Sequence, residues 1–159
     1  MTENPSPALD TALAYHRAWT SHNFEQAMTY IAEDIICETP AGRLEGAVAF
    51  RGFMGPFTQI LTNSNLIAAF GDDEKALLMY DTETVPVASA PGSECLTVQN
   101  GTITHLRIIF DRAPFDAARK AAHAPTRAEP SRRSSSRLLE RVGVAGAPGG
   151  HRPAEVTVH

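Results

Sequence analysis

Four short β-type segments, separated by turn sequences, crowd into residues 65–110 and constrain the fold more than any other feature. The segments lie at about 65–70, 75–88, 93–99 and 102–110, and "GDDE", "SAPGS" and "QNG" between them carry residues that favour turns. Antiparallel strands can be joined by such short turns, whereas parallel strands need long crossovers. These residues therefore predict a four-stranded antiparallel meander.

The part of the chain before the meander shows helical patterns. Ser6 followed by Pro7 is typical of a helix start, and the apolar face of that helix is Ala8, Ala12, Tyr15 and Trp19. Asn23, with Gln26 three residues later, predicts the capping box of a second helix. A third helix should be kinked or weakened at Pro56, and its apolar face is Phe50, Phe53, Met54, Phe57 and Ile60.

One further strand and one further helix complete the expected order. The stretch "DIICETP" predicts a short strand, which Pro40 and the turn "AGRLEG" close, and a last helix is expected at about 113–121. Each early helix has one apolar face, and a meander needs one covered face, so the helices must lie on the sheet. The fold class is α+β, with about five strands on three N-terminal helices.

The C-terminal stretch differs from the rest of the chain in composition and charge. Residues 1–120 hold 8 Lys and Arg against 15 Asp and Glu, a net charge of −7, whereas residues 121–159 hold 6 Arg and 3 Glu, a net of +3. The later stretch contains no aromatic residue and is rich in Pro, Ser, Arg and Gly, so it cannot bury enough surface to offset its chain entropy. We expect one domain over residues 1–122 and a disordered basic tail over 123–159.

Several classes of protein are not expected. No apolar run approaches the roughly 18–20 residues that cross a bilayer, and "MTENPSPALD" lacks the features of a secretory signal. Cys37 and Cys95 cannot form a disulfide framework, which favours two reduced thiols in a cytoplasmic protein. No zinc-ligand spacing, phosphate-binding loop or nucleophile elbow is present. We therefore expect no metal, no cofactor and no membrane or nucleic-acid partner.

Strand alternation assigns side chains to faces. In the last strand, Leu106, Ile108 and Phe110 share a uniformly apolar face, which suits the wall of a pocket. Asp111 follows Phe110 and is either a residue that accepts backbone N–H bonds in a turn before the final helix or a catalytic acid, and its place beside Pro114 favours the turn.

The segment "LLMYDTETV" leaves two alternatives open. One face carries Leu77, Met79, Asp81 and Glu83, and the other carries Leu78, Tyr80, Thr82 and Thr84. If the Met79 face points inward, two carboxylates enter the pocket about 6.7 Å apart, and their repulsion raises one pKa as a general acid requires. Otherwise the polar second half of this strand lies outside the core, and its carboxylates do not enter the pocket.

Three stretches together carry a family resemblance: "AYHRAW" in the first helix, "IAEDIICETPAGRLEG" across the first strand, and "NGTITHLRIIFDRAPF" at the end of the meander. With the order of elements between them, they resemble the SnoaL-like and ketosteroid-isomerase-like group of the nuclear-transport-factor-2-like superfamily, over about residues 8–120. The resemblance implies a cone whose curved sheet and helices enclose a pocket, and a homodimer formed through the outer sheet face. Members include isomerases, polyketide cyclases, dehydratases, epoxide hydrolases and non-enzymatic binders.

The resemblance also implies roles for particular positions. Tyr15 matches the helix tyrosine of ketosteroid isomerases, and Glu94 falls near their acidic hydrogen-bond donor. Thr39 occupies the place of their general base and cannot abstract a proton at neutral pH, which argues against that isomerisation. Ile108 stands where epoxide hydrolases carry a carboxylate, which argues against that reaction too.

The sequence thus predicts a pocket for an uncharged, mostly apolar small molecule. One hypothesis is a cofactor-free isomerase, cyclase or dehydratase that uses general acid–base chemistry, with candidate catalytic residues Tyr15, Asp81, Glu83 and Glu94. The alternatives are a ligand-binding or assembly module without chemistry, and a regulatory partner that acts through the basic tail. The candidate ligand-binding residues are Trp19, Thr39, Phe53, Phe57, Met79, Leu106, Ile108 and Phe110.

Overall fold

The computed structural model describes residues 6–124. Its helices are α1 (Pro7–Thr20), α2 (Phe24–Met28), α3 (Ala47–Ile60) and α4 (Ala113–His123). Its strands are β1 (Ile31–Thr39), β2 (Gly42–Glu45), β3 (Leu61–Gly71), β4 (Lys75–Thr84), β5 (Gly92–Gln99) and β6 (Thr102–Phe110). Apart from His123 and Ala124, the expected tail lies outside the described residues.

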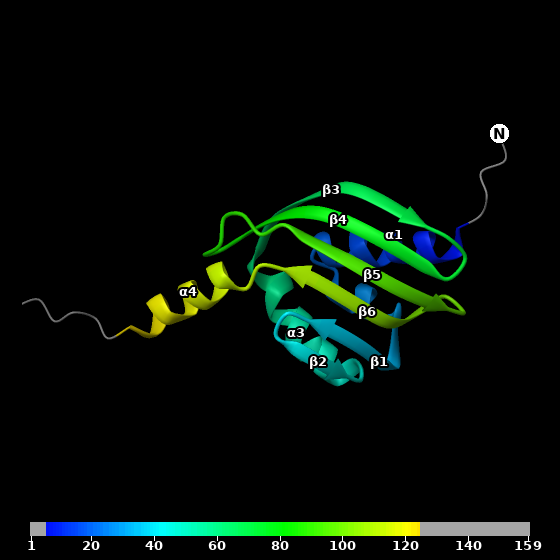
Figure 1. Cartoon of the computed structure of the whole chain (residues 1–159), viewed down its shortest axis with the longest axis horizontal. Coiled ribbons are helices and arrows are strands. Elements are labelled where there is room, and N and C mark those ends of the chain that lie inside the picture. The colour runs from blue at the N-terminus through cyan, green and yellow to red at the C-terminus, as the bar shows by residue number, and fades with distance from the viewer. Residues whose placement is uncertain (1–5, 125–159) are drawn as a thin grey trace, which may run out of the picture. The chain divides into compact units, whose positions relative to one another are not determined.

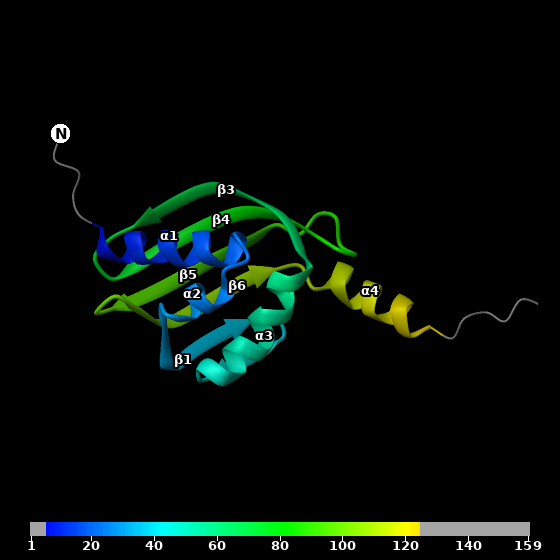
Figure 2. The ribbon, with the colours of Figure 1, turned by 180° about the vertical axis from the view of Figure 1, so that it is seen from behind.

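The strands form one curved sheet in the order β2-β1-β6-β5-β4-β3. All neighbouring pairs are antiparallel except β1 and β6, which are parallel. Figure 1 shows the outer face of this sheet, and Figure 2 shows α1, α2 and α3 on the other face. The predicted α+β class, the meander β3–β6 and the helices on one sheet face are confirmed.

The structure adds one strand to the expected count and corrects one detail. Residues 42–45, read as a turn, form the short strand β2, which pairs with the end of β1 from Ile36↔Glu45 to Thr39↔Gly42. Gly42 has φ of 131°, a conformation that favours glycine, and so it permits the tight reversal between the two strands. Helix α3 continues through Pro56, where the sequence predicted a kink or a weak point.

The core lies between the three N-terminal helices and the inner sheet face. Helix α1 buries the apolar face that its spacing predicted, because Ala8, Ala12, Tyr15 and Trp19 are all fully buried. The inner sheet face contributes buried side chains from four strands: Ile35, Cys37, Ala76, Leu78, Leu96, Val98, Ile103, Leu106 and Ile108. No helix within residues 6–124 is both long and apolar enough to cross a membrane.

One of the two predicted helix caps forms the expected hydrogen bond, and the other does not. The side chain of Asn23 accepts a hydrogen bond from the backbone N–H of Gln26 at 3.3 Å, as its capping role predicts. Ser6 makes no such bond at the start of α1, and its hydroxyl instead donates to the carbonyl of Asp72 at 3.0 Å. That contact ties the start of α1 to the turn between β3 and β4.

Candidate functional site

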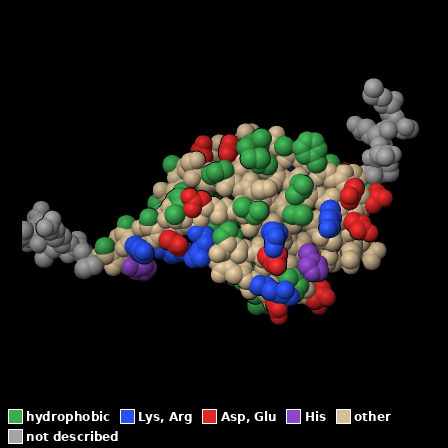
Figure 3. Space-filling model, in the orientation of Figure 1, with side chains coloured by type: hydrophobic (Ala, Val, Ile, Leu, Met, Phe, Trp, Pro, Cys, Tyr) green, Lys and Arg blue, Asp and Glu red, His purple; other side chains and the backbone are tan. Residues whose placement is uncertain are grey.

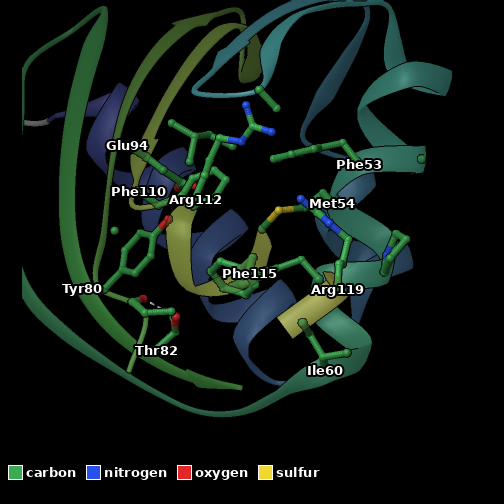
Figure 4. Close-up of a pocket in the computed structure, with 17 residues that line it drawn as sticks. Phe53, Met54, Ile60, Tyr80, Thr82, Glu94, Phe110, Arg112, Phe115 and Arg119 are labelled. Carbon is green, nitrogen blue, oxygen red and sulfur yellow. Dashed lines mark hydrogen bonds between the residues drawn. The ribbon is translucent and has the colours of Figure 1, made fainter. Parts of the chain in front are cut away.

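A cavity of about 370 Å³ lies between α3, the inner face of strands β4–β6, and the start of α4 (Figure 4). This volume is within the range of about 300–1,000 Å³ that small-molecule pockets occupy. Its walls come from segments far apart in the sequence. The lining residues are Ala41, Gly52, Phe53, Met54, Pro56, Phe57, Ile60, Tyr80, Thr82, Ala90, Gly92, Glu94, Ile108, Phe110, Arg112, Phe115 and Arg119.

Four phenylalanine side chains from three elements line the cavity. Phe53 of α3 packs on Phe110 of β6 with ring centroids 6.4 Å apart. Phe115 of α4 meets Phe110 edge-on at 5.9 Å and Phe57 of α3 at 6.4 Å. These contacts hold the first turn of α4 against the open end of the cavity, so α4 completes a site that the sheet and α3 begin. The wall suits a flat or ring-shaped apolar ligand.

Glu94 is the acidic group of the cavity. Its strand, β5, alternates so that Glu94 points inward beside Leu96, and its side chain is fully buried. Neither carboxylate oxygen has a hydrogen-bond partner among the described residues. Burial raises the pKa of Glu94 to about 7, and the nearby Tyr80 hydroxyl, which does not reach hydrogen-bond geometry, opposes that rise only in part.

Tyr80 lines the same cavity from the neighbouring strand β4. Its ring packs against His16 and Trp19 of α1, with centroids 5.1 and 5.4 Å away. Burial raises the pKa of Tyr80 well above its ordinary value, and the Glu94 carboxylate and Tyr15 raise it further. The phenol is therefore protonated at neutral pH, and it can donate a hydrogen bond inside the cavity.

Tyr15 lies in the core near the same carboxyl. Its side chain is fully buried, and its hydroxyl has no hydrogen-bond partner among residues 6–124. Burial raises its pKa well above the ordinary value, and the Glu94 carboxylate and Cys37 add to that effect. Tyr15 does not itself line the cavity. It is a neighbour of Glu94 behind the wall.

Two further polar atoms of α1 are buried without a partner in the described part of the chain: Nδ1 of His16 and Nε1 of Trp19. Burial lowers the pKa of His16 to about 4, so this imidazole is neutral at physiological pH. Buried polar atoms normally find partners, and a cluster of exceptions calls for an explanation. Apart from Oγ of Ser64 on β3, the exceptions among the described residues are Glu94 and three side chains of α1.

The open end of the cavity carries two guanidinium groups. Arg112 precedes α4 and Arg119 lies two turns further on, and their side chains are 42% and 65% exposed. Both form an ion pair with Asp116, which Arg112 approaches to 3.6 Å. Arg112 also donates a hydrogen bond to the carbonyl of Pro40 at 3.3 Å. That bond ties the start of α4 to the turn between β1 and β2.

Three predicted site residues lie outside the cavity, because β4 has its other face inward. The residues from Lys75 to Thr84 alternate strictly between exposed and buried, and Met79, Asp81 and Glu83 are exposed on the outer sheet face. The prediction that they enter the pocket is therefore corrected, together with the carboxylate pair that depended on it. The inward places belong to Leu78, Tyr80, Thr82 and Thr84.

Apart from Tyr15, described above, the other predicted residues divide into two groups. Phe53, Phe57, Glu94, Ile108 and Phe110 line the cavity. Three lie near it without lining it: Trp19, Thr39 and Leu106.

Each of the three has a structural role where it lies. Trp19 packs behind Phe57 at 6.0 Å and Leu106 belongs to the buried core. The hydroxyl of Thr39 accepts a hydrogen bond from the N–H of Ala41 and donates one to the carbonyl of Gly42, so it is engaged in the β1–β2 turn.

The lining residues that were not predicted show only weak patterns in the sequence. Arg112, Phe115 and Arg119 fall at i, i+3 and i+7, one face of the expected final helix, but nothing in their spacing shows which element they meet. Tyr80 and Thr82 lie on the face of β4 opposite to the Met79 face, from which the candidate residues were taken. No group of three or more His, Cys, Asp or Glu side chains within residues 6–124 is arranged to hold a metal ion.

Residues 12–106 match the family described as SnoaL-like domain. A protein from Kribbella flavida DSM 17836, known from a crystal structure, is 62% identical in sequence to this chain. The two structures align with a TM-score of 0.71, over 73% of this chain and 96% of that one. No curated protein sequence matches this chain.

Two more distant structures share the fold. A proposed polyketide cyclase from Sinorhizobium meliloti is 20% identical with a TM-score of 0.55, over 62% of this chain and 93% of that one. A steroid delta-isomerase from Pseudomonas aeruginosa is 11% identical with a TM-score of 0.61, over 77% of this chain and 97% of that one. At these identities the likeness concerns the fold alone.

Proposed function

This chain belongs to the SnoaL-like domain family, and we propose that its cavity binds a mostly apolar small molecule on which Glu94 transfers a proton. One observation carries the proposal. Glu94 is a fully buried carboxyl without a hydrogen-bond partner in the described structure, at the wall of an aromatic cavity. An ionisable group in such a place costs stability, and a role in the site accounts for its presence there.

The pKa of about 7 suits both directions of proton transfer. Near neutral pH, Glu94 is ionised in about half of the molecules, so it can take a proton from carbon or oxygen and return one. The Tyr80 hydroxyl stays protonated and lines the same cavity, where it can donate to a carbonyl or enolate oxygen of the ligand. Isomerisation, cyclisation and dehydration all use a group that removes and returns a proton in this way, and none of them requires a cofactor for that step.

The experiment is the exchange of an acidic C–H proton in D₂O. The ketone 2-tetralone fits an aromatic cavity of this size, and NMR follows deuterium incorporation at its α-carbon. We expect Glu94→Gln to reduce the protein-dependent exchange by 10-fold or more, because the amide cannot accept the proton. The matched control is Glu38→Gln, whose carboxylate forms an ion pair with Arg107 outside the cavity and should not matter. Equal exchange by the wild type and Glu94→Gln would contradict the proposal.

A second candidate function is ligand binding without chemistry. It is favoured by Thr39, whose hydroxyl is engaged in a turn at the position where the resemblance implies a base. Binding of 2-tetralone with no exchange above the solvent rate would identify the cavity as a binding site only.

We also propose that two copies pair through the outer sheet face, as the resemblance implies. Large apolar side chains are exposed there, namely Phe70, Leu77, Met79 and Ile109. Figure 3 shows hydrophobic side chains spread over this face of the molecule. Phe70 lies opposite Leu77 across the β3–β4 pair, which makes the surface continuous between strands. Sedimentation should show a dimer that Leu77→Glu converts to a monomer, and a monomeric wild type would overturn this proposal.

A cytoplasmic location is proposed from the cysteines. Both thiols are free, with Cys37 buried on the inner sheet face and Cys95 pointing to the outer one. Two thiols on opposite faces cannot pair within the chain, as suits a reducing compartment. Fluorescence microscopy of a tagged chain in its own host tests the location.

A further inference from the structure

The open end of the cavity presents two cations that the proposed proton transfer does not use. Arg112 and Arg119 line it from α4, and both side chains reach the cavity that contains Glu94 (Figure 4). The remaining charged side chain among the described lining residues is Glu94, which is fully buried, whereas the two arginines are partly exposed. The charge therefore changes along the cavity, from positive at the solvent end to neutral or negative at the buried carboxyl.

The ion pairs within α4 do not neutralise the positive charge of Arg112 and Arg119 completely. A single carboxylate, Asp116, serves both guanidinium groups, and its contact with Arg112 is long, at 3.6 Å. Each guanidinium has five N–H donors, of which Arg112 uses one on the carbonyl of Pro40. One net positive charge and several donors thus remain for a ligand.

The composition of the domain does not account for two arginines at this place. Residues 1–120 carry a net charge of −7, so a cavity mouth chosen at random on this surface would be acidic. Guanidinium groups match carboxylates through two parallel hydrogen bonds, and nearby apolar walls strengthen such pairs by reducing the access of water. The mouth therefore complements an anion that is attached to an apolar body.

We propose that the ligand is an amphipathic organic acid, whose carboxylate binds Arg112 and Arg119 and whose apolar body lies among the aromatic side chains. The inference rests on the proposed function in so far as both place the ligand in this cavity. It also fixes the orientation of the ligand. The acidic end stays at the mouth, because Glu94 would repel it, and so the far end of the apolar body is the part that meets Glu94 and Tyr80.

The test compares probes that differ only in charge. Calorimetry measures the dissociation constants of 2-naphthoate and 2-naphthamide, and of biphenyl-4-carboxylate and biphenyl-4-carboxamide. The acid of each pair should bind at least 10-fold more tightly, and this preference should decrease as salt is added. A cavity-filling variant, Gly52→Trp, shows where the probes bind. Gly52 lines the cavity, and a Cβ there meets no atom within 4 Å, so a larger side chain can be introduced at this wall without a clash at its Cβ.

Four variants separate the contributions of the charges. Arg112→Gln/Arg119→Gln should abolish the preference for the acid and leave the affinity for the amide within about 2-fold. Arg17→Gln is the control for the single variant Arg119→Gln, because it also removes one positive charge, from an exposed site on α1. Asp116→Asn should tighten binding of the acid, because it frees both guanidinium groups from their shared partner. Arg119→Gln alone should lose a part of the preference without disturbing the bond from Arg112 to Pro40.

The outcomes distinguish the two proposals. If each acid and its amide bind equally and Gly52→Trp blocks both, the inference of an acidic ligand is overturned while the apolar cavity remains a binding site. If no probe binds, or if Gly52→Trp does not affect binding, the ligand site itself is in the wrong place and both proposals fail.

Discussion

The ring of Tyr80 lies directly over Gly92, its partner in the β4–β5 pair, so that a Cβ on Gly92 would lie 2.8 Å from Cε2 of the ring. Glu94 follows two residues later on the same face of β5. The missing side chain at position 92 thus gives Tyr80 the space to lie flat on the sheet and line the cavity beside Glu94.

Gly92→Ala should therefore destabilise the protein and disturb the site. Tyr80 cannot move away easily, because His16 and Trp19 pack on its other side. Overpacking of this kind costs about 1–3 kcal/mol, which chemical denaturation would measure. The control is Gly52→Ala, where a Cβ meets no atom within 4 Å on a helix, and this change should be neutral or stabilise by up to about 1 kcal/mol. Equal effects of the two substitutions would mean that Tyr80 does not lie as described.

Glu94 should make the fold less stable as pH rises from about 4.5 to about 7. In that range the unfolded chain has released the Glu94 proton and the folded chain retains it, because the pKa rises from 4.5 to about 7 on folding. The difference corresponds to about 3 kcal/mol, lost as pH increases through the folded pKa. Denaturation at a series of pH values should show that Glu94→Gln lacks this loss.

His16 should act in the opposite sense over nearly the same range. Folding lowers its pKa from 6.5 to about 4, so the unfolded chain binds a proton that the folded chain excludes. Its contribution to stability is present above pH 6.5 and is lost as pH falls towards 4. The two effects largely cancel in the wild type. Glu94→Gln should reveal a steep acid loss, and His16→Phe should instead become more stable as pH falls from 7 to 4.5. Parallel pH profiles for the three proteins would refute both pKa shifts.

Tyr15→Phe should not destabilise the protein. The substitution removes a buried hydroxyl that has no hydrogen-bond partner among the described residues. Deleting an unsatisfied polar group is neutral or stabilises by about 1 kcal/mol, whereas deleting a paired one costs about that much. Thermal melts decide the matter, since a lower melting temperature would show that Tyr15 has a partner in solution.

The residues after Ala124 should be dispensable for folding. Their composition lacks aromatic residues and carries too few apolar ones to bury against the domain. A chain that ends at Ala124 keeps every helix and strand of the described fold, and we expect it to melt within a few degrees of the full chain. A loss of more than 10 °C would mean that the C-terminal stretch packs on the domain or on a partner.

The sequence was a good guide to the elements and to one wall of the site. The strand from Thr102 to Phe110 has the predicted bounds, because a tight turn begins it and an Asp–Arg–Ala–Pro sequence ends it. Its inward residues Ile108 and Phe110 were assigned correctly, since only one of its two faces is uniformly apolar.

The faces of β4 were harder to assign because each carries polar residues. The inner face is set by partners distant in the chain: Gly92 leaves room for the ring of Tyr80, and α1 covers it. The position of α4 also cannot be predicted from the spacing of its apolar residues, because it depends on the packing of Phe115 against Phe110. The two arginines of the cavity mouth were missed for that reason.

The titration of the Glu94 carboxyl tests the central claim most directly. Carbon-13 labelling of the glutamate side chains gives one carboxyl resonance per glutamate, and the resonance that is missing in Glu94→Gln identifies the group. We predict a midpoint near pH 7, because burial has removed the hydration of the carboxyl and the nearby Tyr80 hydroxyl offsets that loss only in part. A midpoint at or below 4.5 would show that Glu94 is solvated or paired in solution, and it would contradict its role as the proton-transfer group of this cavity.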